Sequence, residues 1–213
     1  MVTNTLNISL YSDALGIDSH YCRLILAEKD VPVNIIEVNA NALPEDVLHL
    51  SPYQRVPLLI DRDVVLYETR IISEYLEERF PHPTLLPTHP APRASSRLLC
   101  YRIFHDWIAI AENIMNTDDK TIKANQARLL ADGLTSVTAV FADRPFFLSD
   151  SYSLADCALS VLLWRLPTLG VILPVQAKPI IKYAQRMFAR EGFALGLSAQ
   201  EKRLSQLQSW SNI

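Results

Sequence analysis

The spacing of hydrophobic and polar positions changes along the chain and divides it into two parts. In the first part, alternating or β-branched apolar runs predict four strands, at residues 6–11, 33–38, 56–60 and 64–67. Helical spacing predicts helices at residues 21–29, from Pro44 onward, and at residues 69–80. The order of these elements is βαβ and then αββα, which predicts a four-stranded mixed sheet covered by helices.

The second part of the chain has an almost purely helical pattern. Helices are predicted at residues 93–116, 121–141, 154–165, 179–190 and 199–208. The helix from residue 154 is apolar on all sides, so we expect it to form the core of a helical bundle. Ser153, with Asp156 three residues later, has the form of a capping box that begins this helix.

A proline-rich connector joins the two parts. Pro81, Pro83 and Pro87 fix φ, remove backbone donors and push the preceding residues toward extended geometry. The chain is therefore expected to form an α/β domain at residues 1–83, a linker at residues 84–92 and an all-helical domain at residues 93–213. Pro81, His82 and Pro83, the Pro-His-Pro segment, can be a plain domain connection or an exposed contact surface. On these residues alone, the connection is the favoured interpretation.

Composition excludes several classes of protein. The 213 residues are 49% hydrophobic and 20% charged, which is typical of a soluble globular protein. The three cysteines are odd in number and widely spaced, so we expect neither a disulfide framework nor a zinc site. Residues 158–175 are apolar but interrupted by Arg165 and Pro167, and the N-terminal residues lack the pattern of a secretion signal. These features predict a cytoplasmic protein without a metal site or a membrane-spanning segment.

Charge is distributed unevenly along the chain. The net charge is −3, but residues 1–83 carry 13 acidic and 6 basic side chains, and residues 84–213 carry 10 acidic and 14 basic ones. The acidic first part argues against direct nucleic-acid binding there and suits a basic protein partner. The basic excess of the second part is spread along helices without a clustered patch, so direct nucleic-acid binding is not expected.

Three short motifs resemble the glutathione transferase fold, which combines a thioredoxin-like N-terminal domain with an all-α C-terminal bundle. They are Val56-Pro57 before a strand, Glu68-Thr69 at a helix start, and the box from Ser153 to Asp156. The resemblance implies a cis peptide before the proline, a valine backbone that faces the ligand, and a Glu-Thr pair that receives the glutamyl carboxylate of glutathione. Alternatively, Val56, Pro57, Glu68 and Thr69 only maintain a turn and cap a helix, which we favour.

The residue that would activate a thiol is missing from the expected place. Residues 15–18 read Leu-Gly-Ile-Asp there, and Asp18 would add negative charge where a thiolate needs to be stabilised. Ser12 and Ser19 are the remaining hydroxyls nearby, and Ser19 is more simply explained as a helix N-cap. Cys22 is expected to be a small buried apolar residue.

A second set of motifs resembles the stringent starvation protein A family. The motifs are Arg-Ile-Ile-Ser-Glu-Tyr-Leu-Glu-Glu-Arg-Phe-Pro-His-Pro at residues 70–83, Leu-Ala-Glu-Lys at residues 26–29, Phe-Leu-Ser-Asp at residues 147–150 and Leu-Trp-Arg-Leu-Pro at residues 163–167. Their number and spacing along the chain make the resemblance specific.

The resemblance implies a homodimeric bacterial protein that binds RNA polymerase holoenzyme, contacts the primary sigma factor and regulates transcription in starvation and acid stress. It places the functional surface at Pro81, His82 and Pro83, and favours contact over plain connection. His89 stands where the best-known family members carry tyrosine, and its imidazole can still stack and form hydrogen bonds. We therefore predict a non-enzymatic regulator without a cofactor. The alternative is a cytoplasmic glutathione transferase that uses Ser12 or Ser19.

Overall fold

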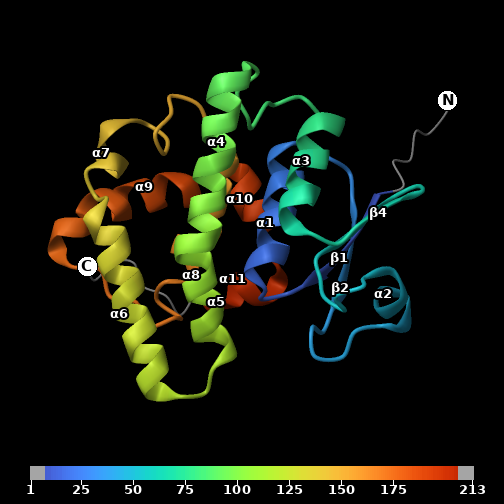
Figure 1. Cartoon of the computed structure of the whole chain (residues 1–213), viewed down its shortest axis with the longest axis horizontal. Helices are drawn as coiled ribbons and strands as arrows, with labels where there is room; N and C mark the ends of the chain where they lie inside the picture. The colour runs from blue at the N-terminus through green and yellow to red at the C-terminus, as the bar shows by residue number, and fades with distance from the viewer. Residues whose placement is uncertain (1–7, 206–213) are drawn as a thin grey trace. The chain divides into compact units, whose positions relative to one another are not determined.

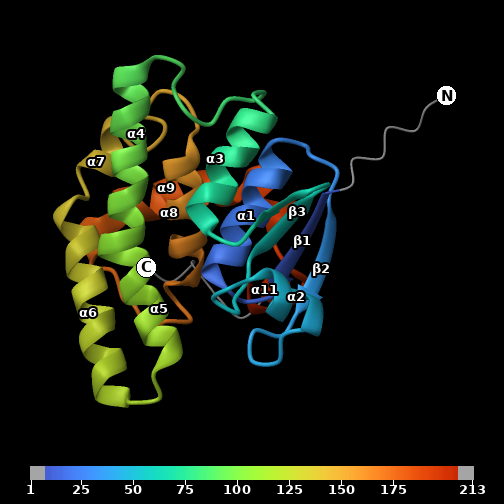
Figure 2. The ribbon, with the colours of Figure 1, turned by 45° about the vertical axis from the view of Figure 1, so that its right-hand side comes forward.

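The computed structural model of the chain describes residues 8–205 (Figures 1 and 2). Within this range the chain forms two compact units, which are described separately. The first unit extends to Pro83 and also contains Glu191–Arg203, and the second unit comprises Thr84–Arg190. The ends of two predicted elements, residues 6–7 of the first strand and residues 206–208 of the last helix, lie outside the described range.

The first unit contains the predicted four-stranded mixed sheet. Its strands are β1 (Ile8–Asp13), β2 (Asn34–Val38), β3 (Leu58–Asp61) and β4 (Val64–Leu66), in the order β2-β1-β3-β4. β1 runs parallel to β2 and antiparallel to β3, and β3 pairs antiparallel with β4. Buried residues alternate along β1 because successive side chains point to opposite faces of the sheet. The predicted fold class is confirmed.

Helices α1 (Ile17–Glu28), α2 (Glu45–Leu50) and α3 (Thr69–Arg79) belong to the same unit, and α1 and α3 pack against each other (Figure 2). The prediction that Ser19 caps α1 is wrong. The helix begins at Ile17 with Gly16 as its N-cap residue, so Ser19 lies inside the first turn. Its hydroxyl accepts a hydrogen bond from the backbone N–H of Asp13 at 3.0 Å.

The segment Glu191–Arg203 packs with the first unit, although the sequence analysis assigned it to the helical domain. It contains α10 (Glu191–Gly196) and the described start of α11 (Ala199–Ser205), and α10 packs against α1 (Figure 1). A Cβ atom on Gly196 would lie 2.9 Å from the Cα of Leu24, closer than van der Waals contact allows. Glycine therefore permits the close approach of the two helices.

A buried cluster of polar side chains joins this segment to α1 through hydrogen bonds and ion pairs. The Arg23 guanidinium donates to the Gly196 carbonyl at 3.0 Å and to the Glu201 carboxylate at 2.8 Å. The same carboxylate lies 3.3 Å from Nδ1 of His20 and accepts the Ser198 N–H at 2.8 Å. The contacts of Arg23 join residues 173 and 178 positions apart in the sequence, which is why helical periodicity gave no sign of them.

The second unit is helical, as predicted. Its elements are α4 (Pro90–Arg102), a π-helical segment η1 (Ile103–Ile108), α5 (Ala109–Asn116), α6 (Lys120–Ser136), α7 (Val140–Asp143), α8 (Leu154–Arg165), a 3₁₀ turn η2 (Val175–Ala177) and α9 (Lys178–Phe188). Every residue of α8 except Trp164 is buried, which confirms the predicted core helix. The helix predicted at residues 93–116 begins three residues earlier than predicted, at Pro90, and the π-helical segment interrupts it.

The predicted capping box fixes the start of α8. The Asp156 carboxylate accepts the N–H of Ser153 at 2.9 Å and its hydroxyl at 2.8 Å. It also accepts the Phe147 N–H at 2.8 Å and the Tyr183 hydroxyl at 2.6 Å. Burial raises the pKa of Asp156, and the four donors oppose that shift. Asp156 is therefore a structural carboxylate of the bundle core.

Residues 8–205 contain no helix of the length and apolarity needed to cross a membrane. The same residues include no group of three or more His, Cys, Asp or Glu side chains in an arrangement that could hold a metal ion.

Candidate functional site

The Pro-His-Pro segment directly follows the C-terminal end of α3. All three of its side chains, those of Pro81, His82 and Pro83, are exposed, whereas the preceding Phe80 is half-buried and ends the helix. The peptide bonds before Pro57 and before Pro83 are both cis. The segment thus presents an imidazole between two pyrrolidine rings to the solvent.

The backbone on both sides of His82 is held from inside the first unit. The ammonium group of Lys29 donates to the Phe80 carbonyl at 2.7 Å and to the Pro83 carbonyl at 2.8 Å. It also forms an ion pair with Glu77 at 2.7 Å, and the side chains of both residues are almost completely buried. Lys29 could not be predicted as part of the site, because a lysine in a Glu-Lys-Asp run at a helix end is normally exposed.

The end of α3 is anchored by a second polar group. Asp61 at the end of β3 accepts the Tyr75 hydroxyl at 2.7 Å and lies 3.5 Å from Nε of Arg79. Burial, and next the hydrogen bond to Asp61, raise the pKa of Tyr75. The Arg79 guanidinium also lies 5.2 Å from the centre of the Phe80 ring. The C-terminal part of α3, which leads into the Pro-His-Pro segment, is therefore held by contacts with Asp61 and Phe80.

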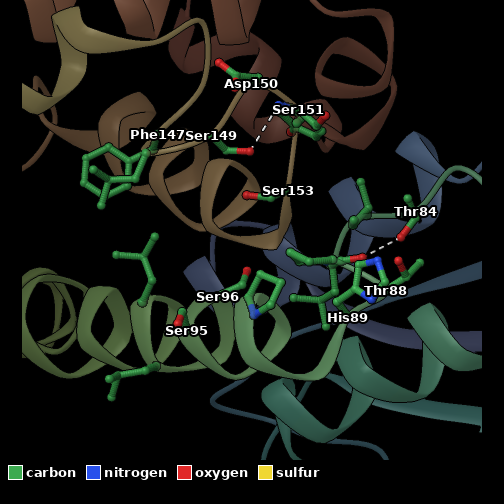
Figure 3. A pocket seen from close by; sticks show the side chains of 18 of the residues that line it. Thr84, Thr88, His89, Ser95, Ser96, Phe147, Ser149, Asp150, Ser151 and Ser153 are labelled. Atoms are coloured by element: carbon green, nitrogen blue, oxygen red, sulfur yellow. Dashed lines mark hydrogen bonds between the residues drawn. The ribbon is translucent and has the colours of Figure 1, made fainter.

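His89 lies in the second unit, where it is the exposed N-cap residue of α4. It borders a groove with a volume of about 710 Å³ (Figure 3). One wall of the groove is α4, which contributes Ser95 and Ser96, and the other is the segment that leads into α8. The Thr84 hydroxyl donates to the Leu86 carbonyl at 2.6 Å and helps to order the chain beside His89. His89 is thus accessible next to a hollow surface.

The residues that the resemblance assigns to glutathione binding have partners within the chain. Asp18 has a raised pKa, mainly because it is buried; the Thr69 side chain opposes this shift and the nearby Glu68 carboxylate adds to it. The Glu68 carboxylate forms an ion pair with Arg55. Glu68 occupies the N-cap position of α3, but it caps the helix without a side-chain hydrogen bond. Glu68 is therefore paired with Arg55, and Thr69 is buried.

The candidate nucleophiles are buried and engaged as well. The Ser12 side chain is 1% exposed and accepts a hydrogen bond from the Arg23 guanidinium, and the buried Ser19 hydroxyl accepts the Asp13 N–H. Cys22 is 0% exposed, as expected for a small core residue. Burial, and next the Asp18 charge, raise the pKa of the Cys22 thiol well above its ordinary value. This arrangement disfavours a thiolate or alkoxide at neutral pH.

Comparison with known proteins defines the class first. The family model for the N-terminal domain of glutathione S-transferase matches residues 10–84, and the model for its C-terminal domain matches residues 93–191. A theta class glutathione S-transferase from the citrus canker pathogen Xanthomonas axonopodis pv. citri, solved with glutathione bound, superposes with a TM-score of 0.80. The comparison covers 91% of this chain and 98% of that one at 20% identity. The fold is that of the glutathione transferases.

Sequence relatives narrow the class to one family. The chain is 43% identical over 201 residues to the stringent starvation protein A homolog of Coxiella burnetii, covering 94% of this chain and 96% of that protein. It is 40% identical over 187 residues to the homolog of Haemophilus influenzae, covering 87% and 88% of the two chains. The chain belongs to the stringent starvation protein A family, and the resemblance found in the sequence is confirmed.

Proposed function

We propose that this protein is a cytoplasmic transcriptional regulator that binds RNA polymerase holoenzyme and contacts the primary sigma factor in stress or starvation. Pro81, His82 and Pro83 form the proposed contact surface. The observation that carries the proposal is the 43% identity, over almost the whole chain, to a stringent starvation protein A homolog. The exposure of all three side chains of the segment supports it.

The chemistry of the segment suits protein recognition. Proline rings have little conformational freedom to lose, so ordering them on binding costs less than ordering flexible side chains. A neutral imidazole offers one donor and one acceptor to a partner. The acidic excess of residues 1–83 favours a basic partner surface and acts more on the association rate than on affinity.

His89 is proposed as a second contact. Its exposure at the N-cap of α4 and the adjoining groove support this role. An imidazole is smaller than the phenol ring that the family carries there, but it can stack on a planar group and form a hydrogen bond. We expect His89→Ala to weaken polymerase binding less than His82→Ala does.

The protein is proposed to act without catalysis, and Val56, Pro57, Glu68 and Thr69 are interpreted as a vestigial glutathione site. Three observations support this proposal. Thr69 is buried, Glu68 pairs with Arg55, and the hydroxyls of Ser12 and Ser19 are both buried. A bound glutathione would have to displace these internal contacts.

We further propose a homodimer in which the α/β domain at residues 1–83 of one subunit packs against the helical domain at residues 93–213 of the other. Residues 1–83 carry a net charge of −7 and residues 84–213 a net charge of +4, which favours this pairing. Light scattering at low and high salt tests it, because an interface with this charge pattern weakens as salt screens the attraction.

Gel filtration of the purified protein with purified RNA polymerase holoenzyme tests the main proposal. We expect the wild-type protein to co-elute with the holoenzyme and the variant Pro81→Ala with His82→Ala to elute separately while it stays folded. The competing function is a glutathione transferase, because a solved structure of this fold contains bound glutathione. Micromolar glutathione binding in calorimetry, together with turnover of a model electrophile, would support the glutathione transferase and contradict the proposed regulator.

A further inference from the structure

Lys29 is a buried cation whose partners all lie at or near the Pro-His-Pro segment. It is the C-cap residue of α1, where a positive charge is favoured by the helix dipole. Its side chain is 0% exposed. An ammonium group has three protons to donate, and Lys29 has three acceptors within 2.8 Å: Glu77 and the carbonyls of Phe80 and Pro83. All three protons of the Lys29 ammonium group therefore have an acceptor.

The two carbonyls stand on opposite sides of His82. Phe80 precedes Pro81, and Pro83 ends the segment, so one ammonium group joins both ends of a three-residue turn. Hydrogen bonds with a charged donor are about twice as strong as neutral ones. Glu77 lies on the last turn of α3 and is 3% exposed, and its carboxylate compensates the buried charge of Lys29.

We propose that Lys29 is a positioning residue that holds the Pro-His-Pro segment in the conformation its partner recognises. The inference rests on the proposed function, since it takes the segment to be the contact surface. Lys29 itself is too buried to touch a partner. It acts through the two carbonyls by keeping the His82 side chain in one orientation relative to α3.

The competing explanation is that Lys29 only stabilises the fold. Substitution of Lys29 alone does not separate the two explanations, because it leaves the Glu77 charge buried without its partner and destabilises the domain. The double variant Lys29→Met with Glu77→Leu does separate them. It replaces a buried ion pair by apolar side chains of similar length, which is often close to neutral for stability. It also removes both hydrogen bonds to the segment.

Two measurements on the double variant test the inference. The first is the NMR order parameter of the His82 amide, which we expect to fall from about 0.85 in the wild type to below 0.6. The second is the affinity for purified RNA polymerase holoenzyme, which we expect to fall about tenfold, corresponding to a binding-competent conformation populated about one-tenth of the time. Loss of the two hydrogen bonds should lower the midpoint of thermal unfolding, but the midpoint should stay above the temperature of both measurements, so that both report on folded protein.

The variant His82→Ala distinguishes failure of this inference from failure of the proposed function. If His82→Ala loses polymerase binding but the double variant binds like the wild type, the surface is correct and the positioning role is wrong. If His82→Ala binds like the wild type, the contact surface itself is wrong, and the order parameter still decides whether Lys29 orders the segment. An order parameter that is unchanged in the double variant would overturn the inference in either case.

Discussion

Removal of Glu201 from its buried ion pair with Arg23 is expected to destabilise the first unit strongly. The two side chains are 4% and 2% exposed and are joined by a 2.8 Å contact. Arg23 also donates to the carbonyls of Gly196 and Asp13. The guanidinium therefore cannot turn to water when the carboxylate is removed. Glu201→Ala leaves an uncompensated buried charge, and such changes cost about 3–5 kcal/mol of unfolding free energy.

Urea unfolding followed by circular dichroism measures this loss. With a denaturant slope of about 2 kcal/mol per molar urea, we expect the unfolding midpoint of Glu201→Ala to fall by about 1.5–2.5 M. The matched control is Asp106→Ala, which breaks the ion pair with Arg102, whose side chains are 69% and 42% exposed. Exposed pairs one helical turn apart contribute about 0.5 kcal/mol or less. A cost below about 1 kcal/mol for Glu201→Ala would refute the reasoning from burial.

Two further predictions concern packing and pH. Gly196→Ala places a Cβ atom 2.9 Å from the Leu24 Cα and should lower the unfolding free energy by about 1–3 kcal/mol. The exposed control Ala194→Ser should stay within about 0.5 kcal/mol, and equal effects of the two changes would contradict the close packing. For Asp18, burial raises the folded-state pKa above the ordinary value of 3.8, so its contribution to stability falls as pH rises through the raised pKa. Asp18→Asn should therefore unfold at a higher temperature than the wild type at pH 7 and at the same temperature near pH 3; a constant difference between these pH values would be inconsistent with this titration.

The sheet and the core helix could be predicted because their signals are local. β2 is rich in β-branched residues, and α8 is apolar on every side between a capping box and a proline. The π-helical segment Ile103–Ile108 could not be predicted, since one additional residue in a turn hardly changes helical periodicity. Helix α10 was missed because its two glycines lower helix propensity, and packing against α1 compensates for them.

Part of the candidate site could likewise be predicted from the sequence, and part could not. The exposure of the Pro-His-Pro segment follows from its prolines and from the absence of an apolar pattern, and the structure agrees. The contacts of Lys29 depend on the C-terminal ends of α1 and α3 meeting across about fifty residues of sequence, which local reasoning cannot supply. Asp18 was identified as a charge that opposes thiolate chemistry, but the burial that raises its pKa depends on the folded arrangement.

The affinity of the purified protein for RNA polymerase holoenzyme, compared between two double variants, tests the central claim most directly. The test variant is Pro81→Ala with His82→Ala. The control, His49→Ala with Pro52→Ala, also replaces an exposed histidine and an exposed proline of the first unit. We predict wild-type affinity for the control and a loss of about thirtyfold or more for the test variant, the effect of a contact hot spot. Wild-type affinity in the test variant would contradict the assignment of this surface.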